Sequence, residues 1–140
     1  QNRPIALDGL FLYENVHHLP KQPVFLTIVD GRITEIDGDP YISHRLRDWL
    51  DGLNDEGCRN GPIHANFGLS RHARLTEHLE WERVRGAMVF GVGDNSLLAP
   101  FVGAEFETSK SGVHWDVQVL RPTLMIDDTA IIETGIVRLE

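Results

Sequence analysis

The residues His114, Trp115 and Asp116 form the most informative pattern in this sequence. They follow a glycine and lie inside a strand-like run from Gly112 to Leu120. Residues i and i+2 of a strand point to the same face, so His114 and Asp116 present an imidazole and a carboxylate side by side, with Trp115 on the other face. Such a pair is half of a metal site, or a histidine that is oriented by an acid.

A third candidate ligand is His64, which lies in a strand-like run after a Gly-Pro turn. Two imidazoles and one carboxylate on one face suit a non-haem Fe(II) or a similar divalent ion with open coordination positions. The alternative is a buried His64 that hydrogen-bonds to Asp116 without a metal, and spacing alone favours this simpler arrangement. The other histidines lie in polar segments and are expected to be exposed: His17, His18, His44, His72 and His78.

Motifs for other chemistries are missing from the sequence. It contains no dinucleotide-binding or phosphate-binding glycine pattern, and its serines lack the context of a nucleophile elbow. The run from Gly91 to Asn95 predicts a tight turn after a strand. This turn either serves backbone geometry alone or lines a site.

Length and composition describe an ordinary soluble globular protein. The chain has 140 residues, so we expect one domain over residues 1–140 with its own core. The net charge is −8 and no Lys/Arg-rich tract occurs, so nucleic acid is not an expected partner. No apolar run approaches the roughly 18 residues of a membrane span. Cys58 is the only cysteine, which fits a reducing cytoplasm.

Two helices and one clear hairpin are predicted. Asp30-Gly31 is a two-residue turn signal between the strand-like runs 23–29 and 32–36. After Pro40, apolar residues recur on one helical face up to Leu53. Thr76 is a suitable N-cap for a second helix through Arg85.

The remaining segments predict a strand-rich α+β domain with about two helices. Further strands are expected at 4–13, 63–69, 87–92, 113–120, 123–126, 130–133 and 136–139.

The long loop Gly93–Gly112 is a candidate binding surface. Long ordered loops in compact domains are usually functional. This loop carries more apolar surface than a solvated loop needs, so a partner or a second copy of the chain is expected to cover it. The alternative is that the loop folds back on its own core. The apolar residues are Leu97, Leu98, Phe101 and Phe106.

Several segments resemble the C-terminal metal-site domain of aminopeptidase T-type metallopeptidases. The run 73–96 carries the resemblance together with the motif 114–116. The hairpin 23–38 and the run 122–128 are similar to the same domain. The resemblance covers nearly the whole chain, and it implies a hydrolase-like C-terminal domain without its N-terminal partner domain.

The departures from that family decide what the resemblance implies. A metal-binding histidine of the peptidases falls on Val89, and a glutamate falls on His64. A two-metal hydrolase needs both ions clamped, so co-catalytic peptidase chemistry is not expected. A relative of the same fold, 2,5-dihydroxypyridine dioxygenase, uses one Fe(II), with a histidine at the position of His64 and a His-x-Asp pair. A serine associated with that iron site falls on Gly91.

Truncated relatives of this domain bind peptides in crocagin-type pathways that make ribosomal natural products. This further resemblance implies a non-catalytic, cytoplasmic peptide-binding protein that takes a precursor peptide along a strand edge, with no cofactor and no catalytic residue. The binding residues would be Leu97, Leu98, Phe101 and Phe106.

Two alternatives to peptide binding stay open. The first is a mononuclear dioxygenase-type enzyme domain, which holds one divalent ion such as Fe(II) or Zn through His64, His114 and Asp116 and needs a partner chain or an N-terminal half. The second is a structural or dimerisation domain.

Overall fold

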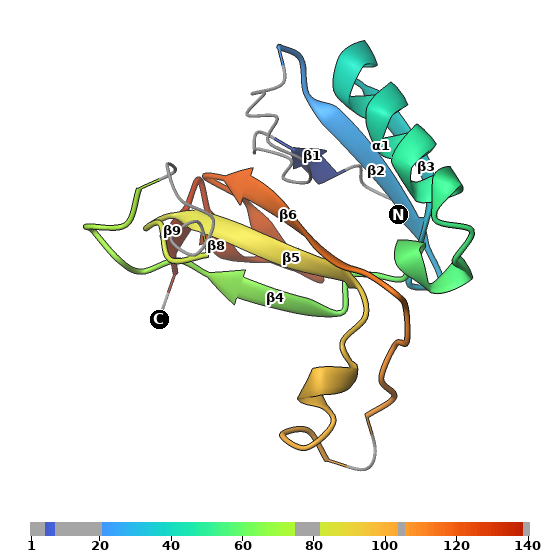
Figure 1. Cartoon of the computed structure of the whole chain (residues 1–140). Coiled ribbons are helices and arrows are strands. Elements are labelled where there is room, and N and C mark those ends of the chain that lie inside the picture. Colours follow the sequence, from blue (N-terminus) through green and yellow to red (C-terminus); the bar gives the residue numbers. More distant parts are fainter. Residues whose placement is uncertain (1–4, 8–20, 75–81, 104–105, 139–140) are drawn as a thin grey trace.

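The computed structural model describes residues 5–7, 21–74, 82–103 and 106–138 (Figure 1). In this part of the chain, nine strands form three antiparallel sheets of three strands each, with one α-helix and two short 3-10 helices. The predicted α+β, strand-rich class is therefore confirmed. None of the helices described is long and apolar enough to cross a membrane.

The first sheet contains β1 (Ile5–Leu7), β2 (Val24–Val29) and β3 (Arg32–Gly38), in that order. The predicted Asp30-Gly31 turn joins β2 to β3, and both turn residues have positive φ, as a tight two-residue turn requires.

The helix α1 (Pro40–Gly52) follows β3 directly. Its N-cap is Asp39, whose carboxylate accepts hydrogen bonds from the backbone N–H groups of Tyr41 and Ile42. The helix ends close to the predicted position. Its apolar face packs against the first sheet because Ile42, Leu46 and Leu50 repeat at helical spacing and are all buried.

The second sheet contains β4 (His64–Phe67), β5 (Ala87–Gly93) and β6 (His114–Leu120), with β5 in the centre. A short 3-10 helix, η1 (Glu56–Arg59), precedes β4. One face of this sheet shares the main core with the first sheet and α1. The core cluster consists of Val24, Leu26, Ile33, Ile36, Ile42, Leu46, Leu50, Cys58, Val92, Trp115 and Val117.

The third sheet is small and contains β7 (Leu124–Ile126), β8 (Thr129–Glu133) and β9 (Ile136–Val137). Between β5 and β6 runs the predicted long loop, with η2 (Ser96–Leu98) at its start. Figure 1 shows this segment extending away from the sheets at the lower end of the view. The predicted second helix lies mainly on residues outside the described ranges, and residues 82–85 form turns and a bridge.

Candidate metal centre

The second sheet brings the three predicted ligands to neighbouring positions on one face. His64 of β4 and Asp116 of β6 both pair with Gly91 of the central strand, one from each side. His114 pairs with Gly93, two residues further along β5. Alternation along β6 points Trp115 into the core, so His114 and Asp116 point away from it. The predicted arrangement of the His-x-Asp pair is therefore confirmed.

The geometry of the group is compact. His64 Nε2 and His114 Nε2 lie 3.2 Å apart, and their rings stack with a centroid distance of 5.1 Å. Asp116 Oδ1 lies 3.3 Å from His114 Nε2 and 3.7 Å from His64 Nε2. The side chain of His64 is 20% exposed, that of Asp116 24% and that of His114 41%. The three groups therefore share one small, half-open space.

Gly91 lies between His64 and Asp116 in the sheet and leaves space for the His64 ring. A Cβ atom at position 91 would lie 2.1 Å from His64 Nε2 and 2.3 Å from His64 Cδ2. A side chain at position 91 would therefore require the His64 imidazole to shift from its place across β5. Gly91 thus accommodates the position in which His64 lies beside the other two ligands.

The hydrogen bond of His114 determines which of its nitrogens faces the group. His114 Nδ1 lies 2.6 Å from the backbone oxygen of Asp94. A carbonyl oxygen only accepts, so Nδ1 must carry the proton and donate it. In the neutral imidazole, Nε2 then presents its lone pair towards His64 and Asp116. Histidines that bind metals usually have their second nitrogen held in this way.

Burial lowers the pKa of His64 below its usual range, and the nearby carboxylate of Asp116 opposes this shift only in part. Loss of solvent disfavours the imidazolium, so the neutral form that can act as a metal ligand is favoured. Two buried polar atoms at this place, His64 Nδ1 and Asp116 Oδ1, have no hydrogen-bond partner among the described residues. An ion in the shared space would give Asp116 Oδ1 a partner, whereas His64 Nδ1 lies on the side of the ring away from that space.

The donor set fits a divalent metal. At the Zn–N distance of about 2.0–2.1 Å, two ligand atoms of one ion lie roughly 2.9–3.4 Å apart. Two of the three separations here fall within this range, and the third is 3.7 Å. In the part of the chain that the structure describes, His64, His114 and Asp116 form the one group of three such residues close enough to hold an ion.

The core fixes β6 beneath this group. Trp115 Nε1 donates a buried hydrogen bond of 2.8 Å to the backbone oxygen of Cys58. The indole also meets Trp49 edge to face, with ring centroids 5.9 Å apart. Because Trp115 lies between His114 and Asp116, these contacts hold the backbone that carries both ligands.

The four apolar residues predicted to bind a partner are all exposed. Phe101 is 84% exposed, Leu97 82%, Phe106 62% and Leu98 37%. These side chains therefore do not fold back onto the core of this chain. Their role in binding stays a prediction.

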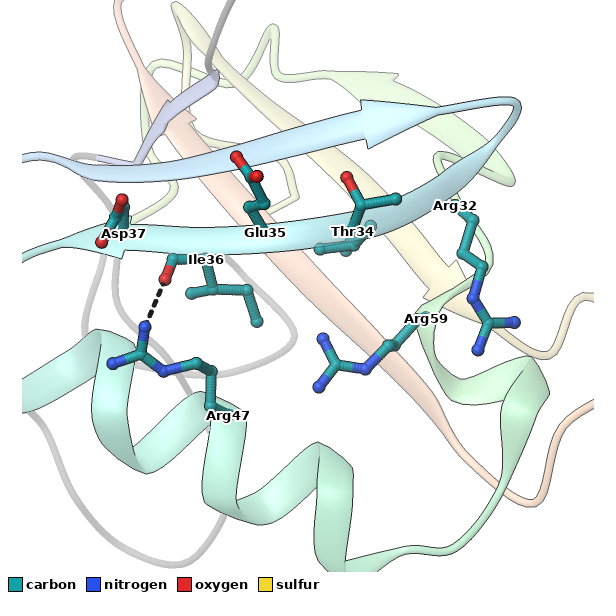
Figure 2. A pocket seen from close by; sticks show the side chains of 8 residues that line it. Arg32, Thr34, Glu35, Ile36, Asp37, Arg47 and Arg59 are labelled. Carbon is teal, nitrogen blue, oxygen red and sulfur yellow. Dashed lines mark hydrogen bonds between the residues drawn. The ribbon is translucent and has the colours of Figure 1, made fainter.

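A groove between β3 and α1 was not foreseen from the sequence (Figure 2). It has a volume of about 620 Å³ and is lined by residues of β3 together with Arg47 and Arg59. Arg47 donates to the backbone oxygen of Ile36 at 2.9 Å, and Arg59 donates to Asp51 at 2.6 Å. At one end, Arg32 donates to the backbone oxygen of Glu56 at 2.7 Å. Each guanidinium therefore already has a partner in the protein.

Comparisons with known proteins find a matching family and a similar solved structure. The family described as "NicX: 2,5-dihydroxypyridine 5,6-dioxygenase" matches residues 9–139. The structure is similar to that of the 2,5-dihydroxypyridine dioxygenase from Pseudomonas putida, with a TM-score of 0.74 and 20% sequence identity. The match covers 99% of this chain and 40% of the Pseudomonas chain. A search of curated proteins finds no match.

These findings support one of the three resemblances noted in the sequence. The dioxygenase resemblance is confirmed at the level of the family. Neither the peptidase resemblance nor the one to peptide-binding relatives receives support from the comparisons. Peptide binding therefore stays a proposal.

Proposed function

The chain belongs to the NicX: 2,5-dihydroxypyridine 5,6-dioxygenase family, and we propose on this basis that it is the metal-binding part of a mononuclear non-haem iron dioxygenase. The observation that carries the proposal is the convergence of His64 Nε2, His114 Nε2 and Asp116 Oδ1 on one space. Two histidines and one carboxylate with open positions form the ligand set of many non-haem Fe(II) oxygenases.

The three side chains would hold one Fe(II) from the sheet side. The chemistry that such an ion would supply is the activation of dioxygen towards an electron-rich hydroxylated aromatic ring. The substrate class follows from the family description, a dihydroxylated pyridine or a closely related ring.

The residues of this chain supply orientation more than proton transfer. His114 is held by the Asp94 carbonyl, and His64 is held above Gly91. Beside them, Glu82 is close enough to His64 to affect its charge, and it accepts a long hydrogen bond of 3.4 Å from Asn66. The chain spans 40% of the length of the Pseudomonas dioxygenase. We therefore propose that the walls that orient substrate and exclude water come from another domain or chain.

Peptide binding by the loop between β5 and β6 is a second candidate function. Its support is the exposure of Phe101, Leu97, Phe106 and Leu98 on a segment that extends from the domain. Exposed apolar side chains that gather in one segment favour a partner. A precursor peptide that pairs with the edge of a strand, or a second copy of the chain, would be that partner.

The first test is metal content. We expect elemental analysis of the purified chain, loaded anaerobically with Fe(II) and desalted, to find one equivalent of iron per chain. His114→Ala and Asp116→Ala should each lose this iron, because two remaining ligands hold an exchangeable ion poorly. Two tightly held equivalents, or unchanged iron in both variants, would contradict the proposal.

A matched control separates loss of ligands from loss of fold. His44 lies on the exposed side of α1, which carries none of the three candidate ligands, and it pairs with Asp48 at 2.9 Å. His44→Ala should retain the full equivalent of iron. Far-UV circular dichroism should show the same secondary structure in all variants.

A further inference from the structure

The turn that follows β5 contacts His114 and the residue before His64. Asp94 is the first residue of this turn. Its carboxylate accepts hydrogen bonds from both halves of the loop between β5 and β6, the outgoing limb after β5 and the returning limb before β6. Oδ2 accepts hydrogen bonds from Ser96 N at 3.2 Å and Ser96 Oγ at 2.8 Å, and Oδ1 accepts one from Ser111 N at 3.3 Å. The outgoing limb and the returning limb, which leads into His114, are thereby tied to one side chain.

The backbone of the same residue orients His114. Asp94 N donates to the backbone oxygen of Val113 at 2.8 Å, and the Asp94 carbonyl oxygen accepts from His114 Nδ1 at 2.6 Å. The carbonyl belongs to the peptide that joins Asp94 to Asn95. A rotation of that peptide would turn the acceptor away from Nδ1. The contacts of the Asp94 carboxylate with Ser96 and Ser111 oppose such a rotation.

Asn95 connects the same turn to the other histidine. Its Oδ1 accepts from Ser109 N at 2.7 Å, which is a second bridge across the loop. Its Nδ2 donates to the backbone oxygen of Ile63 at 3.4 Å, directly before His64. Asp94 therefore contacts the His114 imidazole through its backbone oxygen, and Asn95 contacts the residue before His64 through its side chain.

We propose that Asp94 and Asn95 are positioning residues of the metal centre. Asp94 fixes the Nδ1–H tautomer of His114, and Asn95 fixes the start of β4 that carries His64. This inference rests on the proposed metal-binding function and assigns a role to the turn 91–95 that the sequence left open. Loss of a group that orients a metal-binding histidine typically costs about 10- to 100-fold in metal affinity.

The experiment compares Asp94→Ala with the unsubstituted chain in two measurements. Competition with a chromogenic chelator should show Zn²⁺ affinity lowered about 10- to 100-fold in Asp94→Ala. In the metal-free chain, the ¹⁵N chemical shifts of the His114 ring should show the Nδ1–H tautomer. In Asp94→Ala a clear fraction of Nε2–H should appear. Asp94→Asn keeps one acceptor oxygen of the two and should lie between them.

Asp55 offers a matched control. Its carboxylate accepts from Ser111 Oγ at 2.7 Å and Gly112 N at 2.6 Å, so it anchors the same returning limb without a bond to the Asp94–Asn95 peptide. Asp55→Ala should loosen the limb and leave the His114 tautomer largely unchanged. If Asp55→Ala and Asp94→Ala change tautomer and affinity equally, loop anchoring in general explains the effect and the positioning role is refuted.

The remaining variant tests the second half of the inference. Asn95→Ala should lower Zn²⁺ affinity while the His114 ring keeps its tautomer, because Asn95 acts on the His64 side. Unchanged affinity in a folded Asn95→Ala chain would refute its role. If the unsubstituted chain binds no Zn²⁺, the proposed function fails. The tautomer measurement on the metal-free chain would still decide the role of Asp94.

Discussion

The candidate metal centre and the groove between β3 and α1 are two polar regions of one small domain, and they use their polar atoms in opposite ways. At the metal centre, Asp116 Oδ1 and His64 Nδ1 are buried without a hydrogen-bond partner among the described residues. In the groove, Arg32, Arg47 and Arg59 each donate to an oxygen of the protein. Figure 2 shows the guanidinium of Arg47 turned towards the β3 backbone.

Whether its polar groups have hydrogen-bond partners distinguishes a ligand site from a structural region better than charge or volume does. A polar group that already has a partner must lose it before it can bind a ligand, so satisfied groups mainly hold structure together. A polar atom that faces other ligand atoms without a hydrogen-bond partner, as Asp116 Oδ1 does, gains when an ion arrives. The groove has a volume of about 620 Å³, but the imidazoles and the carboxylate are the groups prepared for a ligand.

The largest predicted effect comes from one added methyl group at the metal centre. In Gly91→Ala the new Cβ would lie 2.1 Å from His64 Nε2, so the His64 ring must leave its place. We expect metal affinity to fall by about 100-fold or more, beyond the usual range for the loss of an orienting group, because a ligand itself is displaced. Chelator competition with Zn²⁺ measures this change.

Gly52→Ala is the control for that substitution. A Cβ at position 52 would meet no atom within 4 Å, so the same chemical change at the end of α1 should leave metal affinity intact. Equal affinity in Gly91→Ala and the unsubstituted chain would show that His64 is not a ligand in the position described.

The next effect concerns stability and involves the carboxylate of Asp39. Asp39 is 5% exposed and accepts hydrogen bonds from Ile42 N and Tyr41 N at the start of α1 and from Lys21 N and Gln22 N before β2. The bond from Ile42 N is the main cause that lowers the pKa of Asp39, and burial opposes it. This carboxylate joins the helix to the sheet.

The stabilisation that the Asp39 carboxylate contributes decreases as the pH falls. The folded-state pKa lies below the unfolded value of about 3.9, so the stabilisation is fully present above that pH and is lost as the pH falls through the lowered pKa. Asp39→Asn should therefore melt at a lower temperature than the unsubstituted chain at pH 7, and the difference should shrink below about pH 4. A Tm difference that stays constant down to pH 2 would contradict this explanation.

A smaller effect is expected in the groove. Arg47→Ala removes one part-buried hydrogen bond to the Ile36 carbonyl, and we expect a loss of about 0.5–1 kcal/mol in unfolding free energy. Metal affinity should not change. Arg47→Lys keeps a donor and should recover part of the stability in urea denaturation. Reduced metal affinity in Arg47→Ala would remove the contrast between the two regions.

Local patterns of the sequence predicted much of this fold. The alternation around Trp115 and the helical spacing after Pro40 are properties of single segments, and both gave nearly the observed bounds. The side-by-side placement of His114 and Asp116 follows from the same two-residue period.

The contacts that position the candidate metal ligands could not be predicted from local sequence patterns. The bond from His114 goes to the main-chain oxygen of Asp94, and every residue type has such an oxygen. The need for glycine at position 91 depends on the register of β4 against β5, which is a property of the folded sheet. The groove combines arginines from three segments, so no single run of sequence marks it.

The exposed loop adds a third kind of surface to the comparison, and it leads to the smallest predicted effect on the domain itself. Phe101 is 84% exposed, so it contributes little to the core of this chain. Phe101→Asp should therefore change unfolding free energy by no more than about 0.5 kcal/mol, as surface substitutions usually do. Its iron content should stay at one equivalent.

The same substitution should act strongly only where a partner covers the loop. A charge at the centre of a buried apolar contact lacks solvent and a counter-ion, so peptide binding or self-association through this loop should weaken sharply in Phe101→Asp. Calorimetric titration with a precursor peptide and sedimentation of the chain alone distinguish the two partners. Thr108→Asp, on the returning limb and only half-buried, is a control for added charge. Unchanged association in Phe101→Asp would assign any partner surface to another face of the domain.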